Sequence, residues 1–315
     1  MTRKIDRREF VKSSARLGVS LALGSGLATE RMLARTAAAG PDKADVAVAI
    51  SADHGKAARK AVEMLGGMKA YVGKGSRVAV LINVQSKNPG TYTKPEILRT
   101  VIRMCREAGA AEVNVLSLLA QKNWDDLELS ALIREEGANL RLLERDGPHF
   151  RTVPVPDGQT LKEARVLAAI YEHDAFFNMP VTKDHAGNRF TGSMKNLMGV
   201  SSGPSNRTFH KENWKTDPGD IAHLDQCIVD LNKAVKPTLN IVDATEIIMT
   251  NGPFGPGELI KPQKVIAGRD RVAVDATCCQ LWGLRPAEII MIARGAEQGL
   301  GVMDAARIAA REEKA

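Results

Sequence analysis

The sequence predicts an α/β fold, a mostly parallel sheet with helices on both faces, with long polar loops between residues 181 and 262. Two observations predict it. Short, almost continuous apolar runs bounded by glycine are typical of strands that are buried on both faces. Amphipathic helical segments alternate with these runs, as in a sheet whose parallel strands are joined by crossover helices. No segment repeats at a fixed period along the chain, so a solenoid is not expected.

The predicted strands and helices follow one another along the chain. Strands are expected at residues 45–50, 77–83, 112–118, 139–143, 175–179, 239–243 and 264–267. Helices are expected at residues 55–65, 95–108, 127–136, 161–172 and 221–235, and from residue 272 to the end. Gly109 and Gly137 directly follow two of these helices, and glycine commonly ends a helix.

Three segments interrupt the alternation of strands and helices. Residues 148–160 are polar and rich in proline, residues 181–214 combine charge with glycine, and residues 251–262 are too rich in Gly and Pro for regular structure. Long loops inside a compact domain are usually functional or disordered, and the Gly, Asn, His and Lys content of these favours function. We expect one α/β domain over residues 40–315, with residues 148–160 as the place where it would subdivide.

An export signal is expected at residues 1–39. The run Arg7-Arg8, then Phe10 and Lys12, resembles the twin-arginine (Tat) signal, although Asp6 stands where Ser or Thr is usual. This resemblance implies passage through the Tat translocase in the folded state and a periplasmic or otherwise exported location. The alternatives are a basic amphipathic helix at the edge of a cytosolic protein and an uncleaved anchor.

The rest of the signal segment agrees with cleavage rather than with a membrane span. The apolar stretch 17–28 is interrupted by glycines and is too short for a bilayer core, which takes about 20 residues. Residues 37–39 are three alanines, which match the small-residue cleavage pattern. We therefore expect no transmembrane anchor after cleavage.

Most of the net positive charge of the chain lies in the predicted signal. The whole chain has 44 Lys and Arg against 37 Asp and Glu, a net charge of +7. Residues 1–39 hold eight basic and three acidic residues, so the mature chain keeps only +2. Because no basic stripe interleaved with aromatic residues is present either, a nucleic-acid partner is not expected.

The four cysteines favour burial over metal binding. Cys105, Cys227, Cys278 and Cys279 show no Cys-x-x-Cys spacing, so the sequence has no zinc or iron–sulfur motif. Each is expected to be a small buried hydrophobic residue. A Cys105–Cys227 disulfide is the alternative that an oxidising compartment would allow.

Basic side chains gather where a buried strand ends. Lys183, His185, Arg189 and Lys195 lie close together in the sequence, directly after the strand at 175–179. In open α/β sheets, ligands bind beyond the carboxyl ends of the strands. The backbone N–H groups at Gly192-Ser193 could add to an anion site if a short helix begins there. The pattern predicts a carboxylate or phosphate ligand, with His185 as a proton carrier; a solvated loop is the alternative.

Asp243 follows a second predicted strand and has two interpretations. It could be a general base, a metal ligand or a partner for Lys183 or His185, or it could cap the segment that follows. By ligand type, His185, His210 and Asp243 would suit a divalent metal, though no spacing requires one. A nicotinamide cofactor is unsupported, because no Gly-x-Gly-x-x-Gly fingerprint follows an early strand.

Two stretches of the sequence resemble the central signature of the domain-of-unknown-function family 362 (DUF362). They are Asn178-Met-Pro-Val-Thr-Lys183-Asp-His185 and Thr191-Gly192-Ser-Met-Lys195-Asn196-Leu-Met-Gly199. The resemblance continues through Arg207, His210, Asp243, Asn251-Gly252-Pro253, Gly257 and Asp275. The resemblance implies a site at these positions rather than a reaction. We expect Lys183, His185 and Asp243 to be catalytic there, and Lys195, Asn196, Arg207, Asn251 and Gly252 to bind substrate. His210 and Asp275 are the candidate metal ligands.

The sequence departs from the family pattern in two places. The early Lys-Pro-Asn of the family is Leu81-Ile82-Asn83 here, so any role of that lysine is absent. Some members carry ferredoxin-like cysteine clusters, and this chain has none, which excludes electron transfer through such a cluster. The leading hypothesis is an exported enzyme that acts on a small anionic substrate. The alternatives are a non-catalytic periplasmic protein that holds a metal or cofactor, and a degenerate member with a structural role.

Overall fold

The computed structural model describes residues 45–315, so the signal predicted for residues 1–39 lies outside the described residues. Their main sheet has eight strands in the order β12-β1-β11-β8-β7-β2-β3-β4. The strands are β1 (Val46–Ile50), β2 (Arg77–Ile82), β3 (Glu112–Ser117), β4 (Asn139–Leu142), β7 (Ala175–Met179), β8 (Leu239–Ala244), β11 (Lys264–Gly268) and β12 (Ala310–Lys314). Only β11 is antiparallel to its neighbours, β1 and β8, which confirms the predicted mostly parallel sheet.

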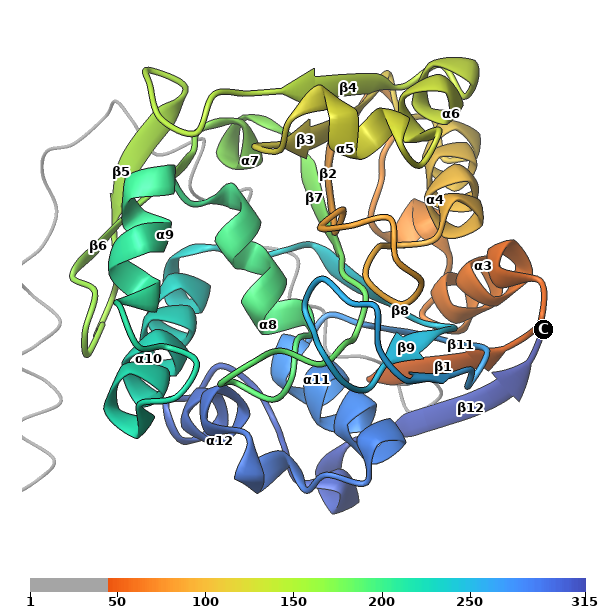
Figure 1. Cartoon of the computed structure of the whole chain (residues 1–315). Helices are drawn as coiled ribbons and strands as arrows, with labels where there is room; N and C mark the ends of the chain where they lie inside the picture. Colours follow the sequence, from red (N-terminus) through yellow and green to blue (C-terminus); the bar gives the residue numbers. More distant parts are fainter. Residues whose placement is uncertain (1–44) are drawn as a thin grey trace, which may run out of the picture. The chain divides into compact units, whose positions relative to one another are not determined.

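Helices cover both faces of this sheet, as Figure 1 shows. One face packs against α3 (His54–Met64), α4 (Pro95–Glu107) and α6 (Leu129–Glu135), and the other against α8 (Ser193–Asn196), α10 (Pro218–Ala234), α11 (Arg271–Cys279) and α12 (Ile290–Glu297). Successive strand side chains point to opposite faces. In β2, Val78 and Val80 therefore join one core while Ala79 and Leu81 join the other.

Smaller elements complete the described chain. They are the helices α5 (Gln121–Asp125), α7 (Ala169–Glu172) and α9 (Gly203–His210), the two-stranded pairs β5 (Phe150–Pro154) with β6 (Glu163–Leu167) and β9 (Ile247–Ile248) with β10 (Leu259–Ile260), and 3-10 turns at Met68–Ala70, Leu197–Val200, Gln280–Trp282, Pro286–Glu288 and Ala305–Arg307. None of the helices among residues 45–315 is both long enough and apolar enough to cross a bilayer.

The order of the strands reverses between β2 and β7. From β2 the chain adds β3 and then β4 on one side, and it returns to place β7 and β8 on the other side of β2. The helix after β2 lies on one face of the sheet and the helices after β7 lie on the other. Such a reversal leaves a crevice beyond the carboxyl ends of the two central strands, where ligands bind in open α/β sheets.

The helix predicted at residues 161–172 is wrong over most of its length. Residues 163–167 form β6, which pairs antiparallel with β5. Ala164 and Val166 are buried while Glu163 is exposed, a period of two that suits a strand. Packing of this hairpin against the core overrides the helix propensity of the Leu- and Ala-rich segment. Residues 148–160, predicted as a connection, accordingly contain β5.

The end of the chain also differs from the prediction. Helices were expected from residue 272 onward, but residues 310–314 form β12, which pairs in parallel with β1 at the edge of the sheet (Figure 1). The sequence Ala-Arg-Glu-Glu-Lys has good helix formers. The open edge of β1 offers a full row of backbone partners, however, and Lys264–Glu312 and Lys60–Glu313 ion pairs hold the strand in place.

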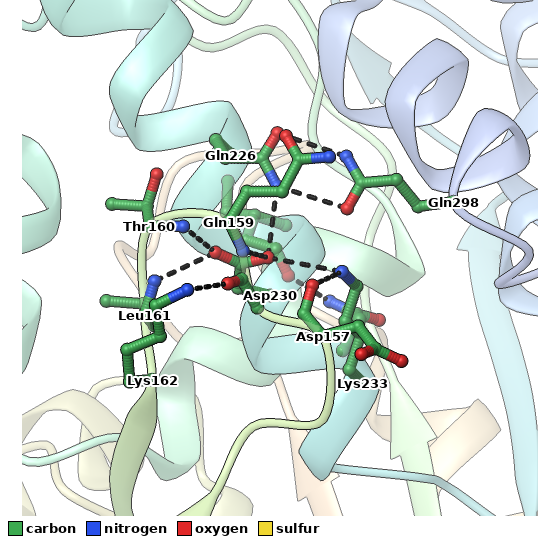
Figure 2. A network of polar contacts seen from close by, with 12 residues as sticks. Asp157, Gln159, Thr160, Leu161, Lys162, Gln226, Asp230, Lys233 and Gln298 are labelled. Carbon is green, nitrogen blue, oxygen red and sulfur yellow. Dashed lines mark hydrogen bonds and ion pairs between the residues drawn. The ribbon is translucent and has the colours of Figure 1, made fainter.

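The hairpin of β5 and β6 is attached to α10 through Asp230, as Figure 2 shows. The fully buried Asp230 carboxylate accepts backbone hydrogen bonds from Gln159, Thr160 and Leu161 at 3.0, 2.6 and 2.9 Å. The amide of Gln226 donates to the same carboxylate at 3.0 Å. Burial raises the pKa of Asp230, but these hydrogen bonds outweigh it and hold the pKa below its usual value. Side chains of α10 therefore fix the proline-rich segment to the domain, Asp230 through three backbone N–H groups and Lys233 through the backbone oxygen of Asp157 at 2.6 Å.

The four cysteines are free and buried, as expected. Cys105 belongs to the core on one face of the sheet and Cys227 to the core on the other. The sheet separates the two thiols, so the alternative of a Cys105–Cys227 disulfide is ruled out by the fold. Burial raises the pKa of both thiols to about 12, which keeps them protonated and unreactive.

Candidate functional site

A cavity of about 740 Å³ opens at the reversal of the strand order. Its walls include the carboxyl ends of β2 and β3, the loop after β7, helix α9, and residues 253 and 254 of the Gly- and Pro-rich segment 251–262. Leu81, Leu116, Leu118 and Met198 form an apolar wall. The cavity also brings together six of the predicted site residues, beyond the carboxyl ends of the central strands. These are Lys183, His185, Lys195, Asn196, Arg207 and His210.

Lys183 lies at the base of the cavity with neutral partners. Its side chain is only 1% exposed, and its Nζ donates to Asn83 Oδ1 at 2.8 Å and to the backbone oxygen of Thr91 at 2.9 Å. Backbone hydrogen bonds between Lys183 and Thr191 fix the loop that carries it. Burial, and then the charge of Lys195, lower the pKa of Lys183 to about 7. The amide oxygen of Asn83 and the backbone oxygen of Thr91, which accept from the Lys183 amino group, are both uncharged.

A row of four hydrogen-bonded asparagine side chains orients Asn83, the partner of Lys183. At one end, the amide of Asn240 donates to the backbone oxygens of Gly268 and Arg269. Asn178 donates to the side-chain oxygen of Asn240, and Asn196 donates to that of Asn178. At the other end, Asn83 donates to the side-chain oxygen of Asn196. The backbone oxygens at one end only accept, and an ammonium group at the other end only donates. These two ends fix every amide of the row, so Asn83 Oδ1 must face Lys183.

Lys195 differs from Lys183 because it has almost no partner. The side chain is 6% exposed, and its Nζ makes one weak contact among the described residues, with Met198 Sδ at 3.7 Å. Asp225 lies near enough to favour the charge on Lys195 but is itself held by the amide of Asn188 at 2.5 Å. Burial lowers the pKa of Lys195 to about 8 and raises that of Asp225 to about 7.

His185 and His210 flank Trp214 on the cavity wall. Each ring centroid lies 5.0 Å from that of Trp214. His185 Nδ1 is 2.7 Å from the backbone oxygen of Ala186, and His210 Nδ1 is 2.8 Å from that of Asn206. Because a backbone oxygen only accepts, each Nδ1 carries the proton and each Nε2 keeps a lone pair. Burial, followed by the charge of Lys195, lowers the pKa of both histidines, so both are neutral bases at pH 7.

The outer part of the cavity is also mainly positive. Arg145, Arg207 and Lys211 line it, against the single carboxylate of Glu212. Lys211 is 3.6 Å from Asp220, whereas Arg145 and Arg207 are exposed and form no ion pair with a described residue. The field of these side chains therefore attracts anions toward the buried lysines.

Asp275 does not line the cavity. It accepts from the backbone N–H groups of Ser193 and Met194 at 2.6 and 2.9 Å. The N–H groups predicted to bind a ligand anion at Gly192-Ser193 therefore bind an internal carboxylate at the start of α8. A Cβ at Gly192 would overlap this carboxylate, which explains the glycine. Through this contact Asp275 sets the position of Lys195.

Asp243 also lies away from the cavity lining. The buried carboxylate accepts from the backbone N–H of Lys94 at 2.8 Å, and from the N–H and hydroxyl of Thr245 at 2.9 and 2.7 Å. It thus holds the start of α4 against the end of β8, and of the segment that follows it binds only Thr245. Because these three donors occupy it, we assign Asp243 to the support of the fold.

Asn251 and Gly252 reach the site indirectly. Gly252 N–H donates to Asp184 Oδ2 at 2.8 Å, and a Cβ at this position would overlap the Asp184 backbone. Asn251 bonds within its own loop, through Nδ2 to Pro256 O at 3.2 Å. The loop is thereby pressed against the segment that carries His185, and its next two residues, 253 and 254, line the cavity in place of Asn251 and Gly252.

The structure does not assemble the proposed metal ligands. His210 lines the cavity, Asp275 caps α8 and Asp243 holds α4. Among residues 45–315, no group of three or more His, Cys, Asp and Glu side chains lies in an arrangement that could hold a metal ion.

Several functional residues were missed by reasoning from the sequence. Asn178 and Asn240, at the centre of the sheet, are the clearest case. Asn178 was recognised only as part of the family signature and given no role, although an asparagine inside a buried apolar strand is a signal for a hydrogen-bonded network. Arg145, Trp214 and Asp225 gave no such signal. They come from three separate segments, of which the tertiary fold brings Arg145 and Trp214 to the cavity and Asp225 close to Lys195.

The chain is similar to proteins of known structure. No curated protein matches the sequence significantly. Among solved structures, the chain is similar to the lactate racemase apoprotein from Thermoanaerobacterium thermosaccharolyticum, with 13% sequence identity and a TM-score of 0.48. The match covers 80% of this chain and 59% of that one, so this chain spans less than two thirds of the racemase structure.

A protein-family model matches residues 78–280, which is more than half of the chain. The matched residues include most of β2 and continue through α11, and therefore contain both buried lysines, the asparagine row and the two histidines of the cavity. The chain belongs to the family described as domain of unknown function DUF362.

Proposed function

We propose that the cavity binds a small organic anion and that the protein is an enzyme acting on it. One observation carries the proposal. Lys183 and Lys195 are both almost fully buried at the base of a cavity, and the contacts of their amino groups with described residues are to uncharged atoms. A buried positive charge without a contacting carboxylate is costly, even with Asp225 near Lys195, and a bound carboxylate or phosphate would reduce that cost.

Three further features support an organic anion with an apolar part. The apolar wall offers burial to a carbon substituent. Thr191 lines the cavity, and its Oγ1 has no hydrogen-bond partner among the described residues, so it is free for a ligand. His185 Nε2 keeps a lone pair and would accept a hydrogen bond from a hydroxyl group of the ligand.

Calorimetric titration of the mature protein with organic carboxylates and phosphates tests the proposal. We expect one tight class of anion, and at least a tenfold loss of affinity in Lys183→Met and in Arg207→Ala. Lys236→Ala is the matched control, because Lys236 is exposed and lies outside the cavity. The proposal fails if no anion binds, or if the cavity variants bind as tightly as the control.

The site of action is part of the same proposal. The twin-arginine pattern at Arg7-Arg8 supports export of the folded protein to the periplasm through the Tat translocase. The described residues that line the cavity all lie between 81 and 254 of one chain, so the cavity can form when this chain folds, before it is transported.

A further inference from the structure

The two buried lysines differ in what holds their amino groups. Lys183 Nζ donates to two oxygen acceptors, which leaves one N–H for a ligand. Lys195 Nζ contacts only the sulfur of Met198 at 3.7 Å among the described residues, although its side chain is buried and lines the cavity. The fold thus anchors one amino group firmly and leaves the other without a strong acceptor.

The geometry points to Lys195 as a nucleophile: we propose that its Nζ forms an imine with the carbonyl carbon of a bound 2-oxo acid. This inference rests on the proposed anion-binding function and names its substrate class. Lys183 would hold the carboxylate with its remaining N–H, and the adjacent carbonyl carbon of the 2-oxo acid would then face Lys195. The apolar wall of Leu81, Leu116 and Leu118 favours a 2-oxo acid with a branched apolar side chain.

The electrostatics agree with this assignment. An amine attacks a carbonyl only in its neutral form, and burial beside a second cation is a known way to obtain that form. Lys195 is buried, and its charge interacts with Lys183 strongly enough to lower the pKa of Lys183. Burial lowers the pKa of Lys195 to about 8 although Asp225 favours its charge, so about half of Lys195 is neutral at pH 8.

The reaction step is balanced by loss of water. The Nζ lone pair attacks the carbonyl carbon, a C–N bond forms and the C=O electron pair moves to the oxygen. The two N–H hydrogens are transferred to this oxygen, which leaves as water, and a C=N bond remains. Asp225, whose raised pKa lets it hold a proton near neutral pH, is the nearby carboxyl that favours the charge on Lys195 and would exchange protons in this step.

Borohydride trapping tests the inference. The mature protein is incubated with 4-methyl-2-oxopentanoate at pH 8 and reduced with sodium borohydride, which converts an imine to a stable secondary amine. Intact-mass and peptide mass spectrometry are expected to show one added group, located on Lys195. Lys195→Arg should abolish the adduct, and Lys236→Arg, which changes an exposed lysine outside the cavity, should retain it.

Two further measurements separate failure of this inference from failure of the proposed function. Calorimetry with 4-methyl-2-hydroxypentanoate, which has the carboxylate but no carbonyl, reports anion binding alone. If the hydroxy acid and the 2-oxo acid both bind but wild-type protein gives no adduct, the imine is disproved and the anion site stands. An adduct spread over exposed lysines at the same yield as on Lys195 also disproves the imine. If neither acid binds and no adduct forms, both proposals fall.

Discussion

Lys183 and Lys195 are buried at a cost to the stability of the fold, and a ligand site would explain why they are there. Each places an amino group in an environment where the charged form is disfavoured, and burial accordingly lowers both pKa values. A structural lysine in such a position would be expected to have a carboxylate partner. The asparagine row supplies only neutral oxygens, and Asn83 directs one of them at Lys183.

Replacing Lys195 by methionine should therefore stabilise the protein while it removes binding. Methionine keeps most of the volume and removes the cost of burying an amino group without a close partner, which is about 1–3 kcal/mol. Because the change also removes the charge that favours ionised Asp225, we expect the free energy of unfolding, measured by urea denaturation, to rise by less than this. Anion affinity should fall at least tenfold. A variant that is both less stable and unchanged in binding would contradict the assignment of Lys195 to a ligand site.

The pH dependence of binding follows from the protonation of Lys183. An anion binds the protonated amine, and Lys183 loses its proton as the pH rises through about 7. Affinity for a hydroxy acid, whose carboxylate stays ionised, should be greatest below pH 7. Above that pH it should fall with a limiting slope of about tenfold per pH unit. Calorimetry between pH 6 and 9 measures this slope, and affinity that stays constant or rises over the range would contradict it.

The part of the site around Lys183 could be predicted from the sequence. Lys183, His185 and Lys195 follow one strand within a short stretch of sequence, so the strand-end rule brings them to one place. Asp243 and Asp275 were assigned to the site on the same kind of pattern, but they turn to backbone N–H groups instead of the cavity. Whether an aspartate faces a ligand or an N–H group depends on elements that are remote in the chain, so the sequence does not show it.

Among the elements, the hairpin of β5 and β6 shows how a remote side chain can hold a turn. Asp230 satisfies three consecutive N–H groups of the turn that joins the two strands (Figure 2). Backbone donors that converge on this carboxylate stabilise a turn where local propensity favours the start of a helix. A prediction from local sequence cannot detect this contact, because Asp230 belongs to α10, far along the chain from the turn.

Asp230→Asn should therefore weaken the hairpin. The amide has one acceptor oxygen in place of two, so at least one buried N–H loses its partner, at a cost of about 1–3 kcal/mol. We expect urea denaturation to show this loss at pH 7. The difference from wild type should disappear as the pH falls through the lowered pKa of Asp230, because wild type then loses the same charge. Glu163→Gln, an exposed change on β6, is the control and should leave stability unchanged.

For the whole molecule, the regular part of the fold could be predicted and its edges could not. Buried parallel strands such as β2 and β7 are continuous apolar runs, and their pattern does not depend on distant partners. The edge strand β12 has the opposite character, because its charged sequence becomes a strand only through the unpaired backbone of β1. Edge pairing is thus a property of the completed sheet.

The whole-molecule prediction concerns export, and it uses the full chain expressed in a Tat-competent bacterial host. We expect the protein in the periplasmic fraction, shortened near Ala39, and we expect Arg7→Lys combined with Arg8→Lys to leave it in the cytoplasm at full length. Lysine keeps the positive charge, so a loss of export would report the arginine pair and not charge alone.

Arg3→Lys, a matched change outside the arginine pair, should export normally. Equal periplasmic amounts of the paired variant and wild type would refute the twin-arginine assignment. That outcome would leave the cavity chemistry untouched, because the described residues that line the cavity lie between 81 and 254, far along the chain from the arginine pair. Export and anion binding can therefore fail independently of each other, and each needs its own measurement.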